Sequence, residues 1–377
     1  MRPDHDAYHW HLSSPPSRRL SPTPGDVDIR MEPNRVWHDP VVEIYSNLIT
    51  PGVRCSAEAY DLANRRWYCL KVEAEVEDDQ WLSSTVATHL GRYYAANREK
   101  PPWNTIRMNA DGSLVTFDSQ PDDKVDRPIR KSLCYGHKRT DRLPTTAVDN
   151  LKNLSYISRS ADRCTWNDQD CVFKRIEFDV DVEVIEDEIQ TRETLIHAMG
   201  LMPATQTNNE MARRFSLVPI LAVVVADRKP WKPGTVAGIL MPYGGEDLES
   251  LVRNRNTGLS LTLTQLLDLV RGVRELAKCG AQHGDIKYWN TVLQPTEQGD
   301  GPGKLMLIDA GSEAPEYDGD ARALGTLLLW CLENTPALRQ DRQAKAMVVA
   351  AASALVNGNF DAALGCLSAR KHVDGAG

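Results

Sequence analysis

Two segments in the second half of the chain decide how the sequence is interpreted. The first reads His283-Gly284-Asp285-Ile286-Lys287-Tyr288-Trp289-Asn290, and the second reads Leu305-Met306-Leu307-Ile308-Asp309-Ala310-Gly311. Together they bring two carboxylates, a lysine and a carboxamide into one short stretch of sequence. The apolar run before Asp309 predicts a short buried strand that delivers this aspartate at its end.

The spacing of these residues resembles that of the protein-kinase-like superfamily, and the likeness covers residues 151–377. The resemblance implies that Asp285 accepts the proton of an attacking hydroxyl and that Lys287 contacts the transferring phosphate. It implies Asn290 and Asp309 as ligands of Mg²⁺, and ATP as the phosphate donor.

The residue types suit this chemistry. Phosphoryl transfer depends on positioning and on positive charge near the phosphate oxygens. Carboxylate and carboxamide oxygens are ligands that Mg²⁺ prefers, and the lysine supplies a point charge two residues from Asp285. We interpret His283, Tyr288 and Trp289 as packing residues.

An upstream lysine and glutamate extend the resemblance. A predicted strand over Cys171–Phe178 contains Lys174, and helical spacing over Val184–Met199 includes Glu188, fourteen residues after the lysine. The resemblance implies an ion pair between them that directs the lysine to the α- and β-phosphates. Two other glutamates of this helix are alternative partners: Glu186 and Glu193.

A predicted strand over Thr235–Met241 leads into Pro242-Tyr243-Gly244-Gly245, which resembles a kinase hinge followed by a helix. The resemblance implies that adenine contacts the carbonyl of Pro242 and the N–H of Gly244. Proline keeps the carbonyl that this role requires, so its missing N–H costs nothing. An earlier apolar segment, Phe215–Val225, also predicts a strand.

The remaining C-terminal sequence predicts helices. Leu263–Cys279 has amphipathic spacing, begins with a capping box of Thr262 and Gln265, and ends before Gly280. The resemblance implies that Asp320, at the start of the next helix, anchors the catalytic loop from below. Residues 335–370 suit two more helices.

The fold class implied is α+β: a bilobal kinase-like fold with a β-rich small lobe (151–243) and a helical large lobe (244–377). Residues 36–150 predict a small α+β module and a linker, and the Pro-rich segment 1–35 predicts a disordered tail. The elements predicted for the module are strands over Val41–Tyr45, Val53–Tyr60, Trp67–Val76, Thr105–Met108 and Leu114–Phe117, a helix over Trp81–Asn97, and a polar linker over Pro121–Val148.

Three departures from the family pattern leave alternatives open. The turn Ser158–Asp162 has no glycine to let backbone amides approach phosphate, Gly284 replaces an arginine, and Asp320 follows Asp309 by only eleven positions. Lys287 favours a protein serine/threonine kinase, because small-molecule phosphotransferases of this fold usually lack that lysine. Gly284 and the short segment favour an aminoglycoside- or choline-type kinase, and the missing glycines favour a pseudokinase that binds nucleotide or partners without catalysis.

Composition limits the partners. A net charge of −8 argues against a general nucleic-acid binder, which needs a basic face. The eight cysteines are scattered without a Cys-x-x-Cys pair, as in reduced intracellular proteins. The longest apolar runs, Leu217–Ala226 and Ala346–Val356, are too short to span a bilayer, and the N-terminus lacks the order of a secretory signal. We therefore expect an intracellular protein, cytoplasmic or nuclear, without a membrane partner.

Overall fold

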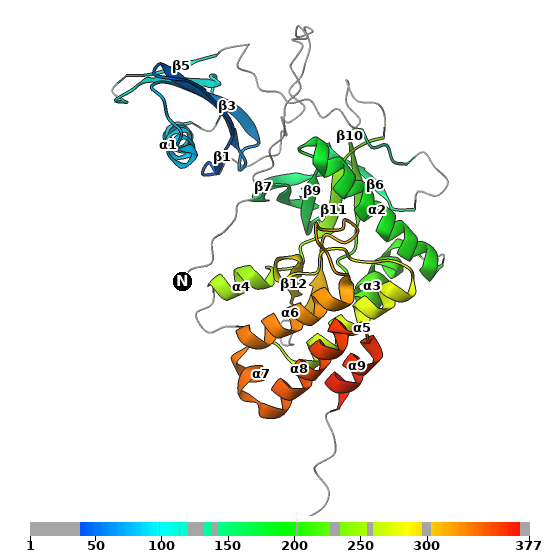
Figure 1. Ribbon diagram of the computed structural model, residues 1–377. Coiled ribbons are helices and arrows are strands. Elements are labelled where there is room, and N and C mark those ends of the chain that lie inside the picture. Colours follow the sequence, from blue (N-terminus) through cyan, green and yellow to red (C-terminus); the bar gives the residue numbers. More distant parts are fainter. Residues whose placement is uncertain are drawn as a thin grey trace, which may run out of the picture. The chain divides into compact units, whose positions relative to one another are not determined.

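The computed structural model describes residues 38–97, 99–112, 114–119, 132–136, 142–200, 203–226, 234–254, 259–295 and 303–369. The described chain is a mixed α+β protein (Figure 1). The predicted tail 1–35 and much of the predicted linker Pro121–Val148 lie outside these residues.

The first sheet has five strands in sequential order, and each of them overlaps a strand that the sequence predicted. They are β1 (Val42–Thr50), β2 (Arg54–Asp61), β3 (Arg66–Glu73), β4 (Thr105–Asn109) and β5 (Val115–Asp118). Helix α1 (Asp79–Ala96) connects the parallel pair β3 and β4. Its buried residues Leu82, Val86 and Leu90 recur at helical spacing and join the apolar core of this sheet.

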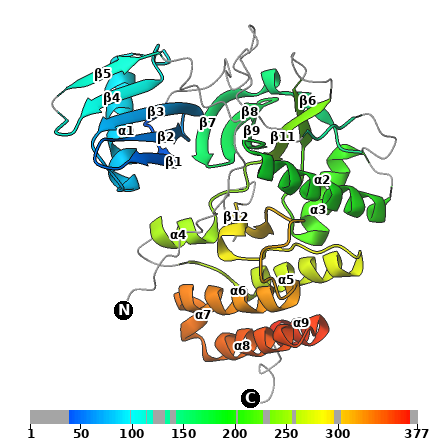
Figure 2. The same cartoon turned by 45° about the horizontal axis from the view of Figure 1, so that its top comes forward.

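The second sheet has six strands in the order β6-β10-β11-β9-β8-β7. In chain order they are β6 (Thr145–Ala147), β7 (Lys152–Ser158), β8 (Ala161–Trp166), β9 (Gln169–Arg175), β10 (Ala222–Ala226) and β11 (Thr235–Pro242). Helix α2 (Asp179–Met199) follows β9 and lies against one face of this sheet (Figures 1 and 2). Side chains alternate between two cores: Ile239 and Met241 face α2, whereas Leu240 lies in the core of the opposite face.

The rest of the described chain is mainly helical. Its helices are α3 (Ala204–Phe215), α4 (Leu248–Asn254), α5 (Leu263–Lys278), α6 (Asp320–Asn334), α7 (Pro336–Gln340), α8 (Arg342–Val356) and α9 (Phe360–Ser368). Helices α6, α8 and α9 lie side by side (Figure 2). The predicted capping box of α5 is confirmed, since the Thr262 side chain accepts from the Gln265 N–H and the Gln265 side chain accepts from the Thr262 N–H.

A two-stranded ladder, β12 (Thr291–Gln294) and β13 (Lys304–Leu307), carries the two sequence segments that resemble a kinase. The first segment ends in a 3₁₀ turn, η3 (Tyr288–Asn290), directly before β12. The second continues from β13 into Asp309. Because β12 and β13 are paired, Asn290 and Ile308 are neighbours, and the Ile308 N–H donates to the Asn290 carbonyl at 3.0 Å.

Three expectations about elements are corrected. Phe215–Val225 is not one strand: α3 ends at Phe215, and β10 begins only at Ala222. Ser216 has a left-handed backbone (φ 50°), which breaks extended structure although the neighbouring residues are buried. The C-terminal region contains α7, α8 and α9 where two helices were predicted. Strand β6 lies within the predicted linker Pro121–Val148 and pairs with β10.

Candidate functional site

Strand β9 and helix α2 bring Lys174 and Glu188 together. Phe173 enters the core of one sheet face, so Lys174 points to the other face, where α2 lies. Glu188 lies between the core residues Ile185 and Ile189 on the buried side of α2. The Lys174 Nζ lies 2.9 Å from the Glu188 Oε2, and this contact confirms the predicted ion pair.

The same ammonium group also meets Asp309. Its Nζ lies 2.8 Å from the Asp309 Oδ1, across 135 residues of sequence. Beneath this pair, the fully buried Arg192 places its Nη2 3.6 Å from the Glu188 Oε1 and donates to the Val218 carbonyl. The lysine therefore lies between two carboxylates, one of which is itself held by a buried guanidinium group.

Burial and charge act in opposite directions on these groups. Burial alone would lower the pKa of Lys174, but Asp309 and Glu188 outweigh it and raise this pKa. Burial alone would raise the pKa of Asp309, yet Lys174 reverses the shift and holds it below its ordinary value. The pair is therefore charged at neutral pH.

A second cluster surrounds Asp285. The Asn290 side-chain amide donates to both the backbone carbonyl and the Oδ2 of Asp285, each at 2.9 Å. The Lys287 Nζ lies 2.7 Å from the Asp285 Oδ1 and 5.0 Å from the ring centre of Trp289. The structure thus brings together all three residues that the sequence singled out in this loop.

The loop is fixed from below by Asp320, in agreement with the prediction. Its carboxylate accepts the N–H groups of His283 and Gly284 and the hydroxyl of Tyr317. His283 is fully buried, and burial lowers its pKa to about 4. Its Nδ1 accepts the N–H of Asp285 at 3.2 Å, which requires a neutral ring.

The residues after Asp309 explain why glycine occupies position 284. Gly284 has φ +89°, and a Cβ there would lie 2.5 Å from the Ser312 carbonyl oxygen. The N–H of Ala314 donates to the Gly284 carbonyl at 3.0 Å. The short segment therefore folds directly onto the loop, and no arginine fits between them.

The same segment also contacts α2. The Ser312 hydroxyl donates to the Asp187 Oδ2 at 3.3 Å, and the Gly311 N–H donates to the His283 carbonyl at 2.8 Å. Asp187 is the residue before Glu188. The segment therefore connects the helix that holds the lysine's partner with the loop that holds Asp285.

Pro242 and Gly244 lie at the end of β11. Tyr243 donates its N–H to the Asp170 carbonyl, so these two residues form a hydrogen-bonded pair of the antiparallel ladder. The adjacent residues, Pro242 and Cys171, therefore form a non-hydrogen-bonded pair. The Pro242 carbonyl therefore points away from β9. Gly244 lies against Val292 of β12, where a Cβ would be 3.0 Å from a Val292 methyl. The predicted adenine contacts thus lie beside the strand that follows Asn290.

Asn290 and Asp309 each keep a side-chain oxygen outside the hydrogen bonds described above. Both hydrogen bonds of the Asn290 side chain use its Nδ2, so its Oδ1 faces elsewhere, and Lys174 occupies only the Oδ1 of Asp309. A carboxamide oxygen and a carboxylate oxygen remain as hard ligands. No cluster of three or more His, Cys, Asp or Glu side chains suited to a metal occurs among the described residues.

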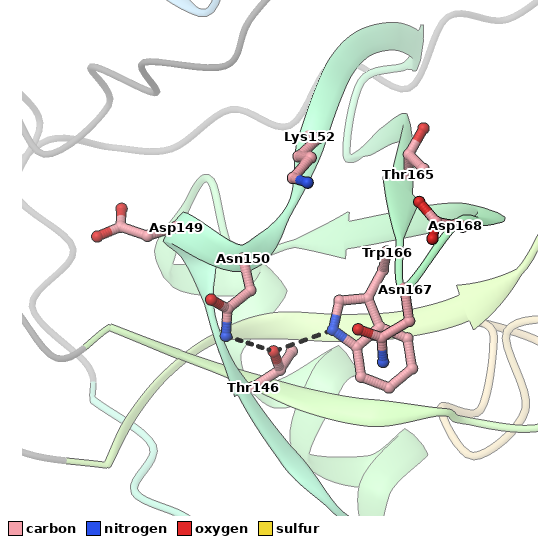
Figure 3. A pocket seen from close by; sticks show the side chains of 8 residues that line it. All are labelled: Thr146, Asp149, Asn150, Lys152, Thr165, Trp166, Asn167 and Asp168. Carbon is pink, nitrogen blue, oxygen red and sulfur yellow. Dashed lines mark hydrogen bonds between the residues drawn. The ribbon is translucent and has the colours of Figure 1, made fainter.

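A separate polar hollow of about 580 Å³ lies on the second sheet, at the turn between β8 and β9 (Figure 3). Thr146 lines it and accepts from the Trp166 indole N–H and from the Asn150 amide. None of the residues predicted for nucleotide or metal binding lines this hollow.

Comparison with known proteins assigns no family: no family model matches this chain, and no curated protein is significantly similar to it. Over the residues that the structure describes, none of the helices has the length and apolar character needed to span a bilayer. Each of the eight cysteines lies in the described residues, and none of them forms a disulfide.

Proposed function

We propose that this chain is an ATP-dependent phosphotransferase with a bilobal, protein-kinase-like domain. In this proposal, the six-stranded sheet with α2 is the small lobe, and the region from α4 to α9 is the large lobe. The nucleotide lies between Lys174 of the first and Asp309 of the second. No membrane partner or nucleic acid is part of this proposal.

The observation that carries it is the contact of Lys174 with both Glu188 and Asp309, at 2.9 and 2.8 Å. The buried cluster is balanced in charge, because Lys174 and Arg192 face the carboxylates of Glu188 and Asp309. A second carboxylate that is partly exposed, with 36% of its side chain accessible, is suited to binding an external cation while the lysine turns to phosphate.

The residues of the loop then have separate roles. Asp285, fixed by Asn290 and Lys287, accepts the proton of the acceptor hydroxyl. Lys287, whose side chain is 39% exposed, neutralises charge on the transferring phosphate. Magnesium, held by Asn290 and Asp309, supplies charge neutralisation at the phosphates when bound. Pro242 and Gly244 orient the adenine.

The acceptor class is a hydroxyl, and the presence of Lys287 favours a protein serine or threonine over a small molecule. One observation favours a second candidate, a pseudokinase that binds nucleotide or partners without catalysis. The turn between β7 and β8 contains Arg159 and Ser160 where glycines would ease the approach of phosphate.

Transfer of radiolabel from ATP to a generic protein substrate tests the proposal, with Asp285→Asn as the loss-of-base variant and Asp318→Asn as an exposed control. We expect label with the unchanged chain and the control, and a loss of about a hundredfold or more in Asp285→Asn. A thermal shift with Mg·ATP but no label in any variant would establish the pseudokinase instead. No shift at millimolar nucleotide would reject both.

A further inference from the structure

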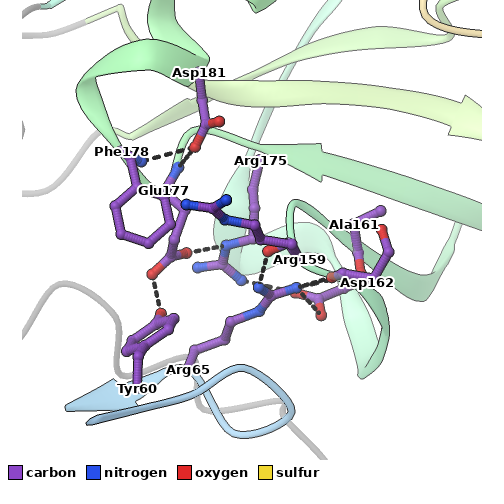
Figure 4. A network of polar contacts seen from close by, with 10 residues as sticks. Tyr60, Arg65, Arg159, Ala161, Asp162, Arg175, Glu177, Phe178 and Asp181 are labelled. Atoms are coloured by element: carbon purple, nitrogen blue, oxygen red, sulfur yellow. Dashed lines mark hydrogen bonds and ion pairs between the residues drawn. The ribbon is translucent and has the colours of Figure 1, made fainter. Parts of the chain in front are cut away.

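A buried arginine of the first sheet contacts the turn that has no glycine. Arg65 lies in the turn between β2 and β3, with a side chain that is 0% exposed. Its guanidinium group donates to the backbone carbonyls of Ser158 (2.8 Å), Arg159 and Ala161 (3.2 Å), and pairs with Asp162 at 3.1 Å (Figure 4). Three carbonyls of one tight turn therefore converge on a single cation.

The contact between Arg65 and the turn belongs to a larger network of buried ion pairs. Asp162 is fully buried and is shared with Arg175 at 2.8 Å, and Arg175 in turn pairs with Glu177 at 2.9 Å. Tyr60 of β2 donates its hydroxyl to Glu177. The network in Figure 4 thus joins the first sheet to β8, β9 and the residues directly before α2. Removing one charge from such a network leaves another buried without its partner.

This contact determines which way the amides of the turn face. In a trans peptide the C=O of one residue points opposite to the N–H of the next. Because the carbonyls of Ser158 and Arg159 point to Arg65, the N–H groups of Arg159 and Ser160 point away from it. The turn is next to Lys174, since Ala161 is the ladder partner of this lysine and Arg175 donates its N–H to Ser160.

A second contact removes the side chain that would obstruct these amides. The Arg159 guanidinium lies over the rings of Phe178 (5.0 Å) and Tyr45 (5.6 Å), which are themselves stacked 5.4 Å apart. Cation–π contacts of this kind hold a side chain in one place. The bulky residue at the tip of the turn is therefore directed to Tyr45 and the start of α2.

We propose that Arg65 is a positioning residue for the nucleotide site: by holding the β7–β8 turn, it presents the N–H groups of Arg159 and Ser160 to the β- and γ-phosphates of a nucleoside triphosphate. In a glycine-rich loop, the glycines leave the backbone N–H groups accessible to phosphate. Here Arg65 of the first sheet makes the N–H groups accessible, from outside the kinase-like domain. The inference rests on the proposed nucleotide site and adds Arg65 as the residue that orders the β7–β8 turn over the phosphates.

Calorimetric titration of the full chain with Mg·ATP and with adenosine separates this role from general stability. Arg65→Lys keeps the buried charge but loses the planar fork. We expect its Kd for Mg·ATP to rise about tenfold and its Kd for adenosine to stay within about twofold, because only the phosphates meet the turn. Arg54→Ala, an exposed residue of the same hairpin, is the matched control and leaves both values unchanged.

A second variant tests whether the Arg159 side chain itself binds phosphate, and it leaves the buried network intact. Arg159→Gly removes the side chain and keeps the carbonyl that Arg65 binds, so its Kd for Mg·ATP stays within about twofold of the unchanged chain. A tenfold loss in Arg159→Gly would show that this guanidinium itself binds phosphate. Equal loss of ATP and adenosine in Arg65→Lys, or no loss of either, would also overturn the proposal.

The two proposals fail differently. If the unchanged chain binds Mg·ATP and Arg65→Lys binds it equally well, the role of Arg65 is rejected and the nucleotide site stands. If the unchanged chain binds neither adenosine nor Mg·ATP, the nucleotide site is rejected and the role of Arg65 falls with it.

Discussion

The carboxylate of Asp320 accepts the backbone N–H of His283 at 2.8 Å, and the neighbouring N–H of Gly284 at 3.1 Å, so a helix N-terminus holds the loop that carries Asp285. Both amides are buried within this contact. An amide left without an acceptor in such a place costs about 1 to 3 kcal/mol.

Asp320→Ala should therefore lower the free energy of unfolding by roughly 2 to 5 kcal/mol, as measured by denaturant titration. Asp318→Ala is the matched control, because its partner Arg322 is exposed and such a pair contributes less than about 1 kcal/mol. Equal effects of the two substitutions would show that Asp320 does not hold the loop.

Lys174 and Glu188 should act as one unit in catalysis. Lys174→Met should reduce kcat/KM by about a hundredfold or more, because in the proposed reaction the lysine contributes charge in the transition state. Glu188→Gln should cost less, since Glu188 acts only by positioning that lysine at 2.9 Å. Once the lysine has been replaced, substitution of Glu188 should not lower kcat/KM any further.

The double variant tests this coupling. We expect Lys174→Met with Glu188→Gln to be no less active than Lys174→Met alone in a radiolabel assay. Multiplicative losses would mean that the two residues contribute independently, and that the ion pair only stabilises the fold.

The sequence predicted the parts of the site that depend on local pattern. The apolar run before Asp309 predicted β13, whereas β12 was not predicted; the pairing of the two strands makes Asn290 a neighbour of Ile308, the residue before Asp309. Glu188, rather than Glu186 or Glu193, meets Lys174 because helical spacing puts it on the buried side of α2; Glu193 instead accepts from Tyr135, Arg142 and Leu143. These positions follow from the side-chain periods of the two kinds of element, two residues in a strand and 3.6 residues in a helix.

Contacts between distant segments without periodicity were not predictable. Nothing near Arg65 indicates that its partner is Asp162, 97 residues later, because a turn arginine is ordinarily exposed. The fit of Ser312 against Gly284 depends on a backbone path that only the folded chain defines. Strand β6 was missed because three residues carry too little alternation to indicate a strand.

Gly284 should be intolerant of substitution in a way that Gly280 is not. Both have positive φ, +89° and +69°, which costs an alanine roughly 1 kcal/mol. Only at Gly284 would the new Cβ also meet a backbone oxygen, that of Ser312, at 2.5 Å; at Gly280 nothing lies within 4 Å.

We expect Gly280→Ala to lower the free energy of unfolding by about 1 kcal/mol, and Gly284→Ala to lower it by more than about 2 kcal/mol and to reduce activity. Thermal or denaturant unfolding of both variants measures the difference. Similar values for the two would mean that the segment after Asp309 does not lie against the loop.

Stability should depend on pH through His283. Burial lowers the pKa of this ring to about 4, whereas an unfolded chain has the ordinary value of 6.5. Between these values the unfolded chain binds more protons, so the contribution of His283 is present above pH 6.5 and is lost as the pH falls toward 4. Asp61 acts in the opposite direction, because burial raises its pKa from 3.8 to about 6.

His283→Gln isolates the first effect, since the contribution of Asp61 is the same in both proteins. On lowering the pH from 7 to 4.5, the unchanged chain should lose about 2 kcal/mol more unfolding free energy than the variant, with a slope of at most about 1.4 kcal/mol per pH unit. Denaturant titrations at several pH values measure this difference. Parallel curves for the two proteins would mean that His283 is protonated in the folded chain, and that its Nδ1 cannot accept the N–H of Asp285.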